Sequence, residues 1–128
     1  MTGRVVHFEI PFDDGDRARS FYSEAFGWQV QPMPEMDYTL VMSGPSGDAG
    51  PTEAGFINGG MIDRKNAPTS APTLAVDVDS IDDTLQKVEK LGGSTVVPKT
   101  SVGGMGFTAY FKDPEGNVIG LWETAPQG

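Results

Sequence analysis

The chain has no cysteine and only one histidine, His7, in its 128 residues. The lack of cysteine excludes disulfide bonds, zinc–thiolate sites and thiol nucleophiles. A serine–histidine–acid triad would have to use His7, and no Gly-x-Ser-x-Gly sequence accompanies it. A phosphate-binding Gly-x-x-x-x-Gly-Lys sequence is also missing. These absences remove several large enzyme classes.

Long apolar runs and basic residues are scarce as well. No apolar stretch is long enough to span a membrane, and the start, "MTGRVVHFEI", lacks the pattern of a secretory signal. Nine basic residues stand against eighteen acidic ones, which gives a formal net charge of −9. Such a surface repels phosphate backbones. We therefore expect one cytoplasmic domain, residues 1–128, with neither a nucleic-acid nor a membrane partner.

Two segments of the chain resemble copies of one unit. The segment "HFEIPFDDGDRARSFYSEAFGWQV" begins at His7 and "TLAVDVDSIDDTLQKVEKLGGSTV" begins at Thr73, so an offset of 66 residues aligns them without a gap. Gly27 then aligns with Gly93, and the apolar periods of the two segments coincide. The sequence predicts two modules, at about residues 4–64 and about residues 70–124.

Each copy begins with an alternating pattern that is typical of a strand. In the first copy Phe8 belongs to an apolar row that we expect to pack on a helix, while His7 and Glu9 face the other way. In the second copy Thr73 occupies the position of His7 and also faces away from the helix. Residues of these outward rows are candidates for a ligand site.

One helix and three further strands follow in each copy. An apolar stripe predicts a first helix that ends at Gly27, and a second that starts after Asp79 or Ser80 and stops at Gly92. The strand candidates lie near 29–34, 38–43, 55–62, 94–98, 106–111 and 117–123. The fold class is therefore α+β, with two tandem βαβββ modules. We expect them to form a curved, cup-like sheet with the helices outside and a ligand in the cup.

Paired units of this kind resemble the vicinal oxygen chelate superfamily, which includes glyoxalase I, bleomycin-resistance proteins and extradiol dioxygenases. The resemblance is carried by "VVHFEIPFDDGDRARSFYSEAFGW" at the front and by "VDVDSIDDTLQKVEKLGGSTVVPK" and "GFTAYFKDPEGNVIGLWE" at the back. It covers nearly the whole chain. The scaffold hosts several chemistries, so the resemblance implies a fold more specifically than a reaction.

Metal-dependent members similar to glyoxalase I take two ligands from each module. Carried over by position, the first ligand is His7 and the third is Thr73, while the second lies near Asn58, where no carboxylate or imidazole is found. The fourth position is Gly120, seven residues after Asp113 in the Asp-Pro-x-Gly turn. Only one good metal ligand remains, so we predict no metal site and no cofactor, with a divalent metal as the alternative.

Glu123 in the last strand is the obvious substitute for the missing fourth ligand. It lies three residues beyond Gly120. An odd displacement along a regular strand places it on the opposite face, away from the expected cup. We therefore interpret Glu123 as a residue outside the ligand site.

The ligand pocket predicted from the sequence consists of five residues: His7, Glu9, Asn58, Thr73 and Trp122. Three functions stay open. The first is binding of a small organic molecule without the usual catalytic metal, as in proteins resembling bleomycin-resistance members. The second is a metal-dependent lyase or isomerase similar to glyoxalase I. The third is a metal-free enzyme with Glu9 or His7 as general base, although no catalytic residue is assigned. The resemblance also implies a homodimer.

Overall fold

A computed structural model describes residues 3–126 of the chain, and it divides them into two compact units. The N-terminal unit is His7–Pro72, and the C-terminal unit combines residues 73–126 with residues 3–6. The start of the chain belongs to the C-terminal unit because the Gly3 N–H donates a 2.6 Å hydrogen bond to the Asp77 carbonyl. The first strand therefore begins in one unit and continues into the other.

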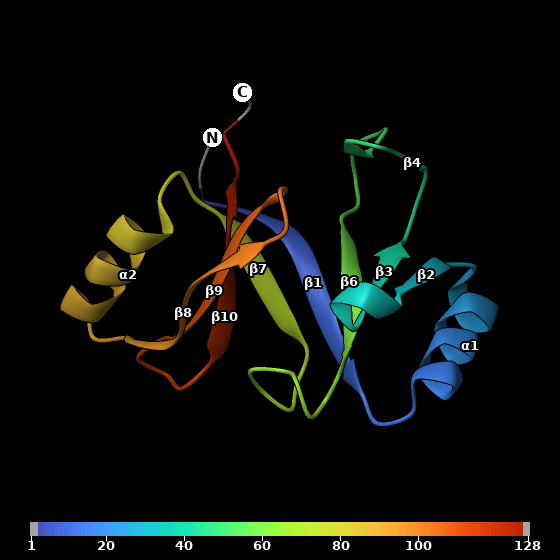
Figure 1. Cartoon of the computed structure of the whole chain (residues 1–128), viewed down its shortest axis with the longest axis horizontal. Helices are drawn as coiled ribbons and strands as arrows, with labels where there is room; N and C mark the ends of the chain where they lie inside the picture. The colour runs from blue at the N-terminus through green and yellow to red at the C-terminus, as the bar shows by residue number, and fades with distance from the viewer. Residues whose placement is uncertain (1–2, 127–128) are drawn as a thin grey trace. The chain divides into compact units, whose positions relative to one another are not determined.

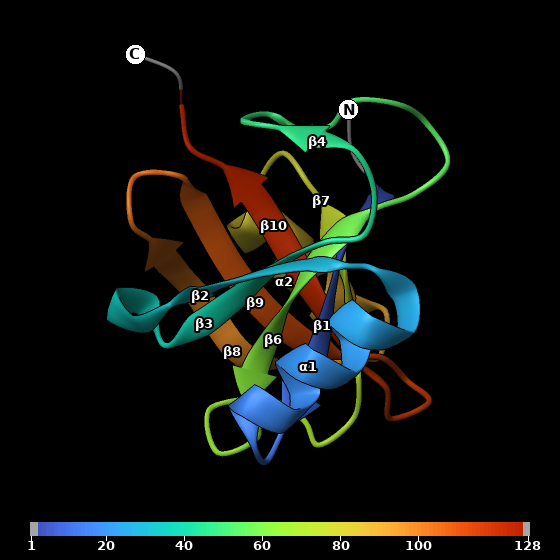
Figure 2. The same cartoon turned by 90° about the vertical axis from the view of Figure 1, so that its right-hand side faces the viewer.

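The N-terminal unit contains one helix and a four-stranded sheet. Its main elements are β1 (Arg4–Phe12), α1 (Gly15–Phe26), β2 (Gln29–Met33), β3 (Tyr38–Met42) and β6 (Asn58–Asp63), with a short 3₁₀ turn, η1 (Pro34–Met36), between β2 and β3. The strand order is β2-β3-β6-β1, and β1 runs parallel to β6. Figures 1 and 2 show α1, in blue, on one side of these strands.

The C-terminal unit repeats this arrangement. Its elements are β7 (Thr73–Asp77), α2 (Ile81–Lys90), β8 (Ser94–Val102), β9 (Gly106–Lys112) and β10 (Val118–Thr124). The strand order is β8-β9-β10-β7, and β7 runs parallel to β10. In both units the first strand therefore pairs with the last, and the third strand lies between the last and the second. The α+β class and the two βαβββ modules are confirmed, while the cup between them stays a prediction.

Local signals in the sequence set the ends of both helices. The Asp14 side chain accepts a hydrogen bond from the Arg17 N–H, and Gly27 ends α1 in the left-handed conformation with φ 72°. The Ser80 side chain caps α2 by accepting from the Asp83 N–H, and Gly92, with φ 102°, follows its end. Of the two candidates for the second cap, Ser80 is the one used.

Each unit has its own apolar interior. In the C-terminal unit the core contains five buried residues: Val78, Ile81, Leu85, Ala109 and Leu121. In the N-terminal unit a stack of aromatic rings joins the sheet to α1. The Phe8 ring centroid lies 5.6 Å from that of Trp28, and Trp28 stacks on Tyr22 of α1 at 5.1 Å. The apolar row of the first strand thus packs toward the helix, as the sequence predicts.

Three details differ from the predicted elements. The last strand of the N-terminal unit starts at Asn58, not near residue 55, because the stretch before it belongs to a loop. This loop contains a small hairpin, formed by β4 (Ser46–Gly47) and β5 (Gly50–Pro51). Strand β8 extends to Val102, with irregular pairing along β9. In residues 3–126, neither helix has the length and apolarity of a membrane span. The cytoplasmic location and the homodimer stay predictions.

Candidate functional site

The candidate site lies on the face of the N-terminal sheet that points away from α1. Arg19 of α1 donates a 3.2 Å hydrogen bond to the Thr39 hydroxyl, which marks the helix side of β3. Tyr38 precedes Thr39 and therefore faces the other side. On β1 the same alternation separates Phe8, on the helix side, from His7 and Glu9.

Three side chains on this face form a hydrogen-bonded group that we call the polar cluster: His7, Tyr38 and Glu9. The Tyr38 hydroxyl lies 2.8 Å from His7 Nε2 and donates a hydrogen bond of 3.0 Å to Glu9 Oε2. The rings of His7 and Tyr38 are also stacked, with centroids 6.4 Å apart. All three side chains are half-buried. The two residues predicted from β1 are thus brought together by a third from β3.

The directions of these hydrogen bonds determine the state of His7. Tyr38 has one hydroxyl proton and gives it to Glu9, so Nε2 of His7 carries the proton that Tyr38 accepts. Burial lowers the pKa of His7 below its usual 6.5, and the nearby Glu9 carboxylate opposes this shift only in part. His7 is therefore neutral near pH 7. It provides no positive charge to balance Glu9.

Gly60 makes room for Tyr38 in the polar cluster. In the sheet Gly60 pairs with Glu9 on β1 and with Leu40 on β3. A Cβ atom at Gly60 would lie only 2.0 Å from the Tyr38 hydroxyl oxygen and 2.2 Å from its ring. The ring therefore crosses the strand over a position where only glycine fits. The missing side chain of Gly60 therefore leaves space for Tyr38.

Asn58 connects the polar cluster to the loop that precedes β6. It pairs in register with His7 on the neighbouring strand. Its Oδ1 accepts a hydrogen bond of 3.0 Å from the Ser43 N–H, and its Nδ2 donates one of 2.8 Å to the Ser46 hydroxyl. Asn58 thus lies beside His7 on the neighbouring strand, while its part in a ligand site stays a prediction. Its amide group holds the loop that lines an adjoining pocket.

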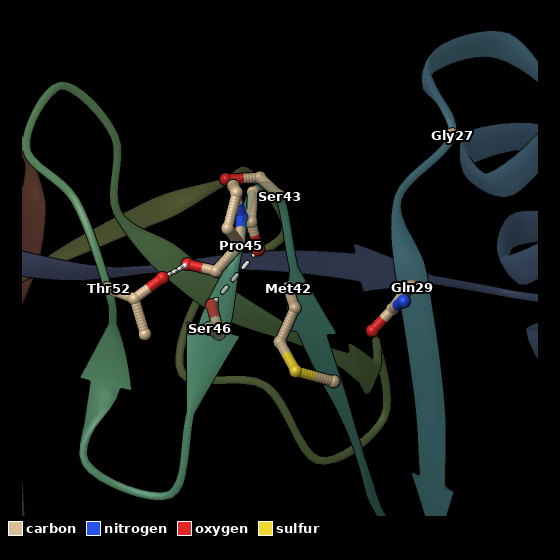
Figure 3. Close-up of a pocket in the computed structure, with 8 residues that line it drawn as sticks. Gly27, Gln29, Met42, Ser43, Pro45, Ser46 and Thr52 are labelled. Carbon is tan, nitrogen blue, oxygen red and sulfur yellow. Dashed lines mark hydrogen bonds between the residues drawn. The ribbon is translucent and has the colours of Figure 1, made fainter.

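This pocket has a volume of about 460 Å³ and is open to solvent. Its lining residues are Gly27, Gln29, Met42, Ser43, Gly44, Pro45, Ser46 and Thr52. Figure 3 shows Gln29 and Met42 on neighbouring strands beside the loop with Ser46 and Thr52. Gln29 and Met42 are also register partners. No sequence pattern indicates this pocket, because its walls come from three separate segments: residues 27–29, residues 42–46 and Thr52.

The other two residues of the predicted pocket belong to the C-terminal unit. Thr73 is the first residue of β7 and is 5% exposed. Trp122 lies on β10, where its Nε1 donates a 3.1 Å hydrogen bond to the Thr124 hydroxyl. A Cβ atom at Gly106 would lie 2.6 Å from the Trp122 ring, so the indole covers this glycine. Their part in a ligand site stays a prediction.

Gly120 and Glu123 occupy opposite faces of β10. Gly120 pairs with Tyr110 and Ala75, and a Cβ atom there would lie 3.2 Å from the Tyr110 ring. Glu123 faces α2, where its Oε1 accepts a 2.8 Å hydrogen bond from the Ile81 N–H. The prediction that Glu123 and Gly120 lie on opposite faces of the last strand is confirmed, while the ligand face itself stays a prediction.

The residues at the family's metal positions do not fit a divalent metal. In the N-terminal unit His7 Nε2 is bonded to Tyr38, and both polar atoms of the Asn58 amide are bonded to the loop. In the C-terminal unit the corresponding residues are Thr73 and Gly120, which supply no charged or imidazole ligand. Within residues 3–126, no three His, Cys, Asp or Glu side chains lie together in a group that could hold a metal ion.

Comparison with known proteins assigns the fold to a family. The family model for the N-terminal part of bleomycin resistance protein-like sequences matches residues 4–44. A glyoxylase-like domain-containing protein of Didymella fabae is 31% identical over 120 residues, which cover 92% of this chain and 91% of that protein. The lactoylglutathione lyase of Haemophilus influenzae is 27% identical, with 91% of this chain and 89% of that protein covered.

Solved structures show the same architecture. A methylmalonyl-CoA epimerase of Streptomyces coelicolor, in complex with 2-nitronate-propionyl-CoA, matches with a TM-score of 0.67. The match covers 98% of this chain and all of that one at 15% identity, so it concerns the fold alone. The paired βαβββ units define a protein of the vicinal oxygen chelate class. The chain belongs to the glyoxalase-like family of this superfamily.

Proposed function

We propose that the chain binds a small organic molecule against the polar cluster, and that binding requires no divalent metal. The observation that carries this proposal is the hydrogen-bonded chain His7–Tyr38–Glu9 on the sheet face away from α1. Ligand sites combine apolar surface with a few oriented polar groups. Leu40, which pairs with Gly60 beside Tyr38, is 37% exposed and supplies such apolar surface.

The charge of the cluster favours certain ligands. Glu9 brings a carboxylate, and His7, whose pKa is lowered by burial, brings no compensating cation near neutral pH. Groups that donate hydrogen bonds are therefore attracted to the cluster more than groups that only accept them. The polar part of the proposed ligand is accordingly a neutral or cationic donor.

A thermal-shift screen of small organic molecules tests this proposal. A ligand at one hundred times its dissociation constant should stabilise the folded chain by about 2.7 kcal/mol. In Tyr38→Phe the hits should bind about three- to tenfold more weakly, because one hydrogen bond within the cluster is lost. Phe21→Ala, at an exposed position on α1, is the control and should leave the affinities unchanged. Hits that stabilise Tyr38→Phe and the wild type equally would refute the proposal.

A metal-free enzyme with Glu9 or His7 as general base is the second candidate. The observation that favours it is the geometry of the cluster. Tyr38 fixes one oxygen of the Glu9 carboxylate, and the tautomer of His7 leaves its Nδ1 without a proton. A base held in this way can remove a proton from the carbon beside a carbonyl group and later return it.

Deuterium exchange tests the second candidate without knowledge of the product. The α-protons of hydroxyacetone are followed by proton NMR in D₂O with and without the chain. A base in the cluster should accelerate exchange, and Glu9→Gln should abolish the acceleration if Glu9 is that base. His7→Gln performs the same test for His7. Equal rates for wild type, both variants and buffer would exclude this activity for simple ketones and leave binding as the function.

A further inference from the structure

The pocket lined by Gln29, Met42 and the loop before β6 favours hydrogen-bond donors in a ligand, because of how its own hydroxyl groups are bonded. Ser43 donates its hydroxyl proton to the Ile57 carbonyl at 2.6 Å. Ser46 donates to the Gly44 carbonyl and Thr52 to the Pro45 carbonyl, each at 3.0 Å. All three hydroxyl protons are thus used by backbone carbonyls. Toward a ligand these hydroxyl groups therefore act as hydrogen-bond acceptors, through their lone pairs.

The rest of the pocket lining also favours a neutral ligand group that donates hydrogen bonds. Ser46 already uses one lone pair to accept from Asn58 Nδ2, whereas a hydroxyl group has two. Gln29 contributes an amide that both donates and accepts, and Met42 contributes apolar surface. Among residues 3–126, no charged side chain lines the pocket. An ammonium group would therefore lose its hydration without gaining a counter-charge, so neutral donors are favoured.

The pocket adjoins the polar cluster on the same unit. Asn58 pairs in register with His7, and the two bonds of its amide reach Ser43 and Ser46, which line the pocket. On β3, Met42 follows Tyr38 by four residues and so shares its face of the sheet. A single extended ligand can therefore contact both places.

We propose that this pocket is a subsite for a neutral, hydroxyl-bearing part of the ligand, whose other end contacts the polar cluster. The inference rests on the proposed binding function and adds the chemical class of the ligand. The hydroxyl groups of such a ligand donate to the lone pairs of Ser43, Ser46 and Thr52. Its carbon skeleton packs on Met42.

NMR titration of the ¹⁵N-labelled chain with two matched probes tests the subsite. The probes are cis-1,2-cyclohexanediol and its dimethyl ether, which has a similar shape but no hydroxyl donors. The diol should shift the signals of Gln29, Ser43, Ser46 and Thr52 in a saturable way. The ether should bind at least about threefold more weakly, because it cannot form the donated hydrogen bonds. Equal binding of both probes, or no shift of these signals, would overturn the proposal.

Two single substitutions on β2 complete the test. Gln29→Leu removes a lining amide and should weaken diol binding about three- to tenfold. Gln31→Leu is the matched control, because Gln31 lies two residues further on the same face of β2, outside the pocket lining. Equal losses in both variants would contradict a specific subsite.

Failure of the subsite can be distinguished from failure of the proposed function. Hits of the thermal-shift screen that depend on Tyr38 but not on Gln29 would refute the subsite alone. Diol binding that depends on Gln29, without any hit that depends on Tyr38, would refute the role of the polar cluster. That result would also refute the proposal that one ligand contacts both the pocket and the polar cluster.

Discussion

Oε1 of Glu123 lies 2.8 Å from the backbone nitrogen of Ile81 and accepts its hydrogen bond. Ile81 is the first residue of α2, so a glutamate from β10 satisfies a backbone donor that the helix itself leaves unpaired. Lys99 Nζ lies 3.3 Å from the other carboxylate oxygen. The strand on which the resemblance places a metal ligand, at the position of Gly120, thus carries a residue that anchors a helix.

The first prediction concerns the stability of this helix anchor. Glu123→Ala should lower the free energy of unfolding by about 1–2 kcal/mol, since the helix loses a capping acceptor and Lys99 loses its partner. Urea unfolding followed by circular dichroism measures the change. Glu115→Ala, in the exposed turn between β9 and β10, is the control and should stay within about 0.5 kcal/mol of the wild type. An unchanged midpoint for Glu123→Ala would show that the contact is dispensable.

The same contact gives stability a dependence on pH. The hydrogen bond from Ile81, followed by the contact with Lys99, lowers the pKa of Glu123 below its usual 4.5. The folded state therefore holds this proton less tightly than the unfolded state. The stabilisation is complete above about pH 4.5 and is lost as the pH falls through the lower pKa of the folded state. In Glu123→Gln this part of the acid dependence should disappear.

The second prediction tests the fit between Gly60 and Tyr38. In Gly60→Ala the new methyl group would lie 2.0 Å from the Tyr38 hydroxyl oxygen, so the ring has to move. Overpacking of this kind costs about 1–3 kcal/mol. Urea unfolding should show that loss. Gly104→Ala is the control, because a Cβ atom there meets no atom of the described part of the chain within 4 Å.

A double-mutant cycle separates the clash from the general cost of changing a sheet glycine. Tyr38→Ala removes the ring, so Gly60→Ala should be nearly neutral when it is introduced into that variant. The difference between the two backgrounds is the energy of the clash. Additive losses would mean that the ring does not lie over Gly60.

The repeat and the helix signals of the sequence were sufficient to predict the α+β class and the two βαβββ modules. The alternation of β1 placed His7 and Glu9 on one face, and the odd spacing of Glu123 from Gly120 placed it on the other. These predictions succeeded because they depend only on the two-residue period of a strand. They need no knowledge of which strands are neighbours.

Tyr38 was missed because its role depends on pairing between strands. It becomes part of the site only when β3 lies beside β6 and Gly60 leaves space for its ring. The sequence shows that Gly60 has no side chain, but it does not show which residue of a neighbouring strand occupies the space. The role of Tyr38 could have been found by searching predicted neighbouring strands for an aromatic residue opposite a glycine.

The third prediction is the pKa of His7. Because His7 is the only histidine, its ring protons can be assigned in a proton NMR titration without ambiguity. The midpoint should lie below 6.5, since burial disfavours the charged form. In Glu9→Gln it should fall further, because the carboxylate that opposes the shift is gone. A midpoint at or above 6.5 in the wild type would contradict a half-buried, neutral His7.

The lowered pKa of His7 also implies a change in stability on the acidic side. The unfolded chain takes up the proton at about pH 6.5, before the folded chain does. The contribution of His7 to stability is therefore present above pH 6.5 and decreases as the pH falls toward the pKa of the folded state. In His7→Gln, urea unfolding between pH 5 and pH 8 should lack this slope.

The fourth prediction concerns metal loading. After incubation with Ni²⁺ or Zn²⁺ and desalting, the chain should retain far less than one metal ion, and His7→Ala should retain no less than the wild type. The reason is that His7 Nε2 and the Asn58 amide are already bonded to protein groups, and metal ligation would have to break those bonds. Elemental analysis of the desalted protein measures the ratio. The similarity to a lactoylglutathione lyase indicates which activity to measure if the chain does bind a metal. Nearly one metal ion per chain, lost in His7→Ala, together with chelator-sensitive activity on a hemithioacetal, would replace metal-free binding by a metal-dependent lyase.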